Sequence, residues 1–203
     1  MKNGAALLIV DVQNDFCPGG ALAVLDGDRV AELLSRVAGC FAAAGLPVLA
    51  SRDWHPPVTR HFSGCGGVWP PHCVQNSPGA AFHPSLRLPE GTLVISKGDT
   101  PDSDSYSAFD GRGEDGRPFR DLLDLLEIRH LYVGGLATDY CVRSSVMDAR
   151  KAALEVTVLS DAIAGVEVAA GDCEKALEEM DRAGATFCTT DEAARRISGI
   201  SAR

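Results

Sequence analysis

The sequence predicts an α/β fold: a doubly wound, six-stranded parallel sheet. Two observations predict it. Short apolar runs recur along the chain, and segments with apolar residues at helical spacing separate them. The run AALLIV at residues 5–10 is apolar throughout, as expected of a strand buried on both faces of a parallel sheet. Strands that alternate with helices form right-handed crossovers around such a sheet.

The predicted elements follow one another without an internal repeat or a dividing linker. We expect one domain over residues 1–203, because this length suits a single large core. A helix over 28–44 has apolar residues at helical spacing, and Gly45 follows where helices often end. The helix over 118–128 has proline at its start. The predicted strands are 5–10, 46–51, 92–96, 130–134, 156–159 and 185–188; further helices are expected at 139–153, 168–183 and, as a short element, after 191.

The segment 56–91 differs from the rest. It is rich in Pro, Gly, Ser and His and shows no periodicity. A loop of this length inside a compact domain is usually functional or disordered. Its aromatic and histidine residues favour a functional loop.

Composition and charge limit the classes of partner. A formal net charge of −9 argues against nucleic acid and anionic membranes, because both require a basic face. No run of about 18 apolar residues occurs, so we expect neither a membrane anchor nor a signal peptide. The seven cysteines are scattered and odd in number, which predicts free thiols in a reducing, cytoplasmic location.

Chemically active residues follow the predicted strands. Asp11 ends the first strand, Asp53 and His55 follow the second, Lys97 ends the third, and the segment 137–141 follows the fourth. In doubly wound folds ligands bind beyond the carboxyl ends of the strands. Each residue alone could be a helix cap or a solvated side chain, but their convergence on one edge predicts a site.

Cys141 lies where a strand and two glycines lead into a helix. Free N–H groups and the helix dipole favour a thiolate at such a position. A buried cysteine is also a common small packing residue. From its position alone, Cys141 is therefore either a nucleophile or part of the core.

Asp53 and His55 are two residues apart, so both can point to one face of the strand end. His61 and His72 follow in the Pro-rich loop. A carboxylate with imidazoles suits one divalent metal ion such as zinc, iron or manganese. The alternatives are ordinary loop histidines, or a zinc site that includes Cys65 and Cys73, whose spacing fits no compact zinc motif.

Four motifs carry a family resemblance: DVQNDF at 11–16, RDWHPP at 52–57, WPPHCV at 69–74 and ATDYCV at 137–142. In this order the chain resembles the nicotinamidase family, a branch of the isochorismatase-like cysteine hydrolases. The resemblance covers nearly the whole chain. It implies the isochorismatase-like arrangement, in which helices flank both faces of a six-stranded parallel sheet.

The resemblance also implies catalytic roles. Cys141 would be the nucleophile, Asp11 the general acid and base, and Lys97 their ionic partner. The backbone N–H groups of Ala137 and Cys141 would form the oxyanion hole. A cis peptide between Leu136 and Ala137 is implied as well.

A metal site and a substrate pocket follow from the same resemblance. The metal would leave a position open for the ring nitrogen of a pyridine substrate. Flat side chains would enclose the ring, although core or lid packing would also explain them. The implied metal ligands are Asp53, His55, His61 and His72; the implied substrate-binding residues are Phe16, Trp69 and Tyr106.

Two departures from the family pattern stand out. The sequence Gln-Asn-Ser at 75–77 replaces the more usual Gln-Gly-Thr beyond His72. Three acidic residues lie within 99–104, just past Lys97, either as a solvated loop or as a rim that alters substrate preference.

The predicted function is a metal-dependent amidase that hydrolyses nicotinamide to nicotinate and ammonia through a cysteine thioester. It would also accept pyrazinamide and serve NAD salvage and pyridine nucleotide biosynthesis. The alternatives are a related amidase for another small carboxamide or carbamoyl compound, or a catalytically silent metal-binding module. Isochorismatase chemistry fits this sequence less well, because its vinyl-ether cleavage needs no thiol nucleophile. The expected partner is a small molecule, and homo-oligomerisation is left open.

Overall fold

One mostly parallel sheet forms the centre of the computed structural model, which describes residues 4–102 and 105–201. Within those residues the strand order is β4-β3-β2-β1-β5-β6-β7. The strands are β1 (Ala5–Val10), β2 (Val48–Asp53), β3 (Leu93–Lys97), β4 (Arg112–Gly113), β5 (His130–Leu136), β6 (Glu155–Ala164) and β7 (Thr186–Cys188).

The six predicted strands are present and pair in parallel. The structure adds β4, which pairs antiparallel with β3 at the edge of the sheet. This strand has only two residues, one of them a glycine, so it leaves no alternation of apolar and polar residues in the sequence.

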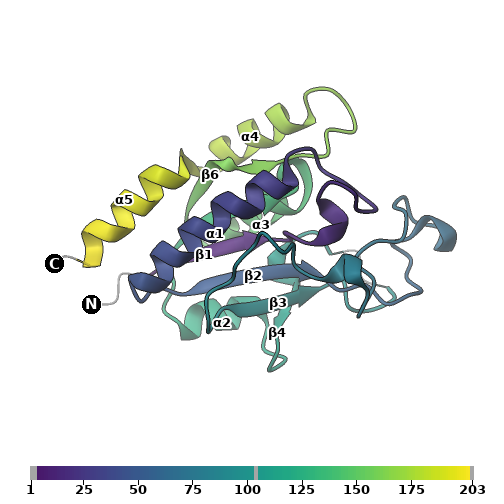
Figure 1. The fold of residues 1–203 in the computed structure, drawn as a ribbon, viewed down its shortest axis with the longest axis horizontal. Coiled ribbons are helices and arrows are strands. Elements are labelled where there is room, and N and C mark those ends of the chain that lie inside the picture. Colours follow the sequence, from purple (N-terminus) through teal and green to yellow (C-terminus); the bar gives the residue numbers. More distant parts are fainter. Residues whose placement is uncertain (1–3, 103–104, 202–203) are drawn as a thin grey trace.

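Helices cover both faces of the sheet, as predicted (Figure 1). On one face lie α1 (Gly27–Ala43) and α5 (Thr190–Ser201). On the other lie α2 (Phe119–Leu125), α3 (Arg143–Lys151) and α4 (Asp172–Arg182). None of the described helices is both long and apolar enough to cross a membrane.

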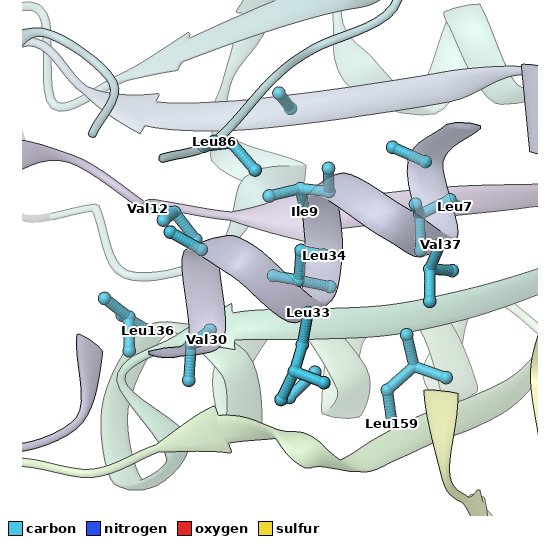
Figure 2. Packing of buried hydrophobic residues seen from close by; sticks show 14 of the residues in the cluster. Leu7, Ile9, Val12, Val30, Leu33, Leu34, Val37, Leu86, Leu136 and Leu159 are labelled. Carbon is cyan, nitrogen blue, oxygen red and sulfur yellow. The ribbon is translucent and has the colours of Figure 1, made fainter. Parts of the chain in front are cut away.

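Strand β1 lies in the centre of both cores. Leu7 and Ile9 pack beneath α1, where Val30, Leu34 and Val37 meet them (Figure 2). The alternate residues of β1 face the opposite layer and contact the core under α2 and α3. Burial on both faces explains why every residue of this strand is apolar.

The carboxyl ends of the strands meet the long segment that follows β2 (Figure 1). Apart from two short 3-10 turns, Ser63–Cys65 and Pro78–Ala80, this segment has no helix. Isolated bridges, among them His55 to Val74, fix it in place. The region predicted to be a functional loop is therefore an ordered, irregular layer over the strand ends.

The segment after β5 differs from the predicted continuous helix in its first turn. A π-helical turn spans Thr138–Val142, and α3 begins only at Arg143. π-helical turns occur frequently at functional sites. Cys141 lies in this turn, which we call the nucleophile turn.

Candidate active site

Lys97 lies at the centre of a buried charged cluster. Its Nζ is 2.9 Å from Oδ2 of Asp11 and 3.5 Å from Sγ of Cys141. It also donates a hydrogen bond to Oδ1 of Asp53. The three partners come from the ends of β1 and β2 and from the nucleophile turn, so the structure brings the predicted catalytic residues together.

Two factors set the pKa values in this cluster: its burial, and the presence of two carboxylates beside one ammonium. Burial raises the pKa of Asp11, and Lys97 only partly offsets this effect. Burial alone would raise the pKa of Asp53, but Lys97 and His55 outweigh it and hold this pKa well below its usual range. Burial would lower the pKa of Lys97, but Asp11 and Asp53 raise it well above its ordinary value, so the amine stays protonated.

Cys141 rests as a thiol in this environment. Burial raises the pKa of Cys141 well above its ordinary value, although Lys97 acts in the opposite direction. The nearby carboxylates of Asp11 and Asp53 add to the increase. The helix N-terminus favours a thiolate, but desolvation and these two carboxylates act in the opposite direction. Sγ of Cys141 lies within 4.8 Å of a carboxylate oxygen of Asp11, close to a potential base.

Three histidines gather beside the charged cluster. His55, His61 and His72 each place a ring nitrogen within 4.8 Å of the others. Nδ1 of His55 lies 3.0 Å from the carbonyl of Gly98, and Nδ1 of His72 lies 2.8 Å from that of Pro70. Because a carbonyl only accepts, both Nδ1 atoms carry the proton and both Nε2 atoms are left as ligands.

Asp53 faces these Nε2 atoms. Its Oδ2 lies 3.7 Å from Nε2 of His55 and 3.9 Å from Nε2 of His72, too far for hydrogen bonds. Nε2 of His55 is buried and has no hydrogen-bond partner. Such separations suit donors that share one ion at about 2 Å from each atom. The three histidines thus form a donor set that fits a divalent metal ion, and Asp53 faces two of them. The role of all four residues as ligands of one ion stays a prediction.

Local backbone contacts hold His55 and His72 in place. The N–H of His55 donates to the carbonyl of Cys73 at 3.0 Å, which joins the end of β2 to the segment carrying His72. Gly98 packs directly on the His55 ring, since a Cβ there would lie 2.5 Å from its Cε1 atom. With φ of +65°, this position also favours glycine by conformation.

A pocket opens beside Cys141 and the histidines. The three predicted substrate-binding residues line it, and Nε1 of Trp69 donates a 2.9 Å hydrogen bond to the hydroxyl of Tyr106. Tyr140 packs edge-to-face on Trp69, with ring centroids 5.1 Å apart. The lining residues are Phe16, Leu22, Asp53, His61, Trp69, His72, Tyr106, Ala137, Tyr140, Cys141 and Val166.

The predicted oxyanion-hole segment borders the pocket. The peptide between Leu136 and Ala137 is cis, as the resemblance implied. The carbonyl of Ala137 accepts hydrogen bonds from the N–H groups of Tyr140 and Val142, both at 3.1 Å. Ala137 and Cys141 both line the pocket, and their role as oxyanion donors stays a prediction.

Sequence reasoning missed the residues that support the site. The Gln13 amide donates to the carbonyls of Asp53 at 2.8 Å and Ala80 at 2.9 Å, and accepts from the N–H of Asp53 at 2.8 Å. Ser51 donates to Oδ1 of Asp11 at 2.7 Å. Gln13 belongs to the first motif, which offered a signal, whereas Ser51 is part of an apolar strand pattern and offered none.

The pocket also has walls that the sequence did not indicate. Tyr140 could have been inferred, since it precedes the nucleophile. Leu22 and Val166 come from loops without any motif, and only the folded chain brings them to the pocket.

The structure also bears on the cysteines and on the acidic stretch after Lys97. All seven cysteines are free. Among the described residues, no cluster with metal-binding geometry includes Cys65 or Cys73. In the acidic stretch, Asp102 forms an exposed ion pair with Arg60 at 3.1 Å, and residues 103–104 lie outside the described part of the chain.

Comparison with known proteins agrees with this geometry. The isochorismatase domain matches residues 5–192 of the chain. The nicotinamidase of Escherichia coli (strain K12) is 43% identical over 202 residues, covering 91% of this chain and 94% of the relative. The chain belongs to the isochorismatase family.

Solved structures extend the family relationship. The pyrazinamidase of Pyrococcus horikoshii, in complex with zinc, superimposes with a TM-score of 0.84 at 40% identity. That match covers 92% of this chain and 99% of the other. A protein from L. infantum in complex with nicotinate gives a TM-score of 0.78 at 35% identity, covering 92% and 93%. The isochorismatase-like fold and an amide-hydrolase family are therefore shared over nearly the whole chain.

Proposed function

We propose that this protein is a metal-dependent nicotinamidase that converts nicotinamide to nicotinate and ammonia. One observation carries the proposal: Cys141, whose thiol lies 3.5 Å from the buried Lys97 ammonium, lines the same pocket as His61 and His72 of the three-histidine cluster and as Asp53. The names of the similar E. coli and P. horikoshii enzymes support the substrate class.

The first step uses the proximity of Asp11 to Cys141. Asp11 takes the thiol proton while sulfur attacks the carboxamide carbon. Burial raises the pKa of Asp11, which makes it a better base than an ordinary carboxylate. Lys97 stays charged and stabilises the sulfur and the carboxylate as the proton moves between them.

Negative charge then develops on the carbonyl oxygen. The backbone N–H groups of Ala137 and Cys141 are the proposed donors to it. Loss of one such donor typically costs about 2.7–4 kcal/mol of transition-state stabilisation. A backbone donor keeps its position without side-chain motion, so it stabilises the charge where it forms.

The proton held by Asp11 next goes to the leaving nitrogen, and the C–N bond breaks to release ammonia. A thioester to Cys141 remains. Asp11 then removes a proton from water, which attacks the thioester and returns Cys141 as a thiol. The sum is one amide and one water consumed, one carboxylic acid and one ammonia formed.

The residues that would hold the metal are Asp53, His55, His61 and His72. A divalent ion held there would supply a Lewis acid toward a ring nitrogen of the substrate, and the residues around it would orient the carboxamide toward Cys141. Zinc, iron and manganese all suit this donor set, and the P. horikoshii structure contains zinc. Asp53 also holds Lys97, so the same carboxylate orients the catalytic amine.

The pocket walls suit a flat heteroaromatic ring. Phe16, Trp69 and Tyr106 supply large aromatic surfaces around the thiol. Pyrazinamide has the same outline and a nitrogen in the same position, so we propose that it is a second substrate. The acidic net charge supports a small neutral substrate over nucleic acid or an anionic membrane. The seven free thiols support a cytoplasmic location.

The deciding experiment measures ammonia release from nicotinamide by the purified protein, before and after chelation and metal add-back. We expect turnover that falls with chelation and returns with metal. If chelation leaves turnover unchanged, the protein is still an amidase, but the proposed role of the metal in substrate binding is refuted. No ammonia from metal-replete protein would refute the nicotinamidase proposal, and a wider panel of carboxamide and carbamoyl compounds would then identify the substrate.

A further inference from the structure

Asp139 joins the nucleophile turn to a distant loop. It lies two residues before Cys141 and is 9% exposed. Its Oδ1 accepts a hydrogen bond from the N–H of Val166 at 3.0 Å, and its Oδ2 accepts one from the N–H of Glu167 at 2.8 Å. One carboxylate thus binds two successive backbone N–H groups of the loop between β6 and α4.

The loop approaches Asp139 closely at Gly165. A Cβ on Gly165 would lie 2.0 Å from Sγ of Cys173 and 3.0 Å from Oδ1 of Asp139. Any larger residue there would have to displace the Cys173 side chain and would press on the Asp139 carboxylate. The loop therefore lies where both hydrogen bonds to Asp139 can form.

This loop forms part of the substrate pocket through Val166. The Val166 side chain lines the pocket together with Tyr140 and Cys141 of the nucleophile turn. The two segments are thus walls of one cavity, and the Asp139 carboxylate fixes one relative to the other. Hydrogen bonds to a charged acceptor are stronger than neutral ones, so this link is stiff.

We propose that Asp139 is a positioning residue that holds the Val166 wall against the nucleophile turn and so determines affinity for the flat ring of the substrate. This inference rests on the proposed nicotinamidase function. It predicts an effect on KM. Without the Asp139 contacts the loop that carries Val166 would be more mobile, and substrate binding would have to offset the entropy cost of ordering it. The thiol, its base and Lys97 belong to other contacts, so the chemical step is left nearly intact.

The test variant is Asp139→Asn in the metal-loaded protein. Asparagine keeps the shape but places an NH2 group against one of the two N–H donors. Hydrogen exchange should become faster at the amides of Val166 or Glu167 while the amides of β1 and β5 stay protected. KM for nicotinamide should rise about tenfold, the equivalent of one lost charged hydrogen bond, with kcat within about twofold.

Asp161→Asn is the matched control. The Asp161 carboxylate also accepts two hydrogen bonds, from N–H and Oγ1 of Thr190 at 2.8 and 2.7 Å. Asp161 does not line the pocket. This variant should leave KM and kcat unchanged even if it lowers the melting temperature.

Gly165→Ala supplies a second, independent variant, because its Cβ would meet the Asp139 carboxylate and the Cys173 thiol without changing a charge. It should raise KM in the same way. The proposal is overturned if Asp139→Asn lowers kcat at constant KM, if the loop amides stay as protected as in the parent protein, or if Gly165→Ala leaves KM unchanged. The exchange measurement needs no substrate, so it tests the link even if nicotinamide is not hydrolysed.

Discussion

The Asp53 carboxylate accepts a hydrogen bond from Nζ of Lys97 with one oxygen and turns the other toward the histidines. Its backbone is held in turn by the Gln13 amide. One side chain thus faces both the Lys97 cluster and the histidines. Changes at Asp53 and at His55 should consequently have different effects, although both residues are proposed metal ligands.

His55→Ala should lose the metal and raise KM for nicotinamide sharply, while the contacts of Lys97 with Asp11 and Cys141 remain. Asp53→Asn should lose the metal and lower kcat as well, because Lys97 loses one of its two anionic partners. Metal content by mass spectrometry and steady-state kinetics would separate the two outcomes. Equal loss of kcat in both variants would show that Asp53 acts only through the metal.

Cys141→Ala should abolish turnover while the fold and the metal content stay unchanged. The thiol supplies the covalent step, and alanine fills much of its space within the core. The control is Cys65→Ala, which changes an exposed thiol and should leave kcat unchanged. Residual activity in Cys141→Ala comparable to that of the parent would exclude the thioester mechanism.

Lys97→Met should remove activity and also destabilise the protein. Without the ammonium, two buried carboxylates face each other, and breaking a buried ion pair in this way costs about 3–5 kcal/mol. Urea unfolding would measure the loss. Lys151→Met is the surface control: Lys151 pairs with Asp148 at 2.9 Å in solvent, and such pairs contribute at most about 1 kcal/mol.

The acid limb of the activity profile should reflect Asp11. Its carboxylate form is the base, and burial raises its pKa above the ordinary value of 3.8. As the pH falls through this raised pKa, Asp11 takes up a proton and kcat/KM should decline. The decline should thus begin at a higher pH than an exposed aspartate would give. Metal content measured at each pH would separate this effect from metal loss, and a limb centred at or below 3.8 would contradict it.

Leu34→Ala should destabilise the fold without changing the site. Leu34 is fully buried between α1 and the sheet (Figure 2), and a Leu→Ala change in such a core costs about 2–5 kcal/mol. Leu125→Ala is the control, since Leu125 is 63% exposed and should change stability by less than about 0.5 kcal/mol. Thermal or urea unfolding would show the difference, with kcat unchanged in both variants.

The sequence predicted most of the fold because its core pattern is regular. Because β1 is buried on both faces, all of its residues are apolar, and because α1 is buried on one face, its apolar residues recur at helical spacing. The active residues were found by the same rule, since they follow the ends of adjacent parallel strands. What escaped prediction is local or indirect: β4 is too short for a pattern, and the π-helical turn has the composition of an ordinary helix start.

The electrostatic surroundings of Cys141 could not be read from the sequence. Helix position favours a thiolate, but the burial of Cys141 and the nearby carboxylates of Asp11 and Asp53 raise its pKa, and only the folded chain shows them. Gln13, Asp139 and Val166 were missed because their roles depend on contacts with backbone groups far along the sequence. Gln13 and Asp139 lie within family motifs, but which backbone groups they contact can be seen only in the folded chain.

Strand order has a consequence for how the enzyme is made. Because β5 pairs with β1, Cys141 and Asp11 become neighbours only when the chain closes a loop that contains α1, β2, β3 and α2. Contacts between such distant residues form late, since the loop-closure entropy must be overcome first. The three histidines precede Cys141 in the sequence, so they are synthesised before the thiol. The catalytic pair is therefore absent from every shorter nascent chain.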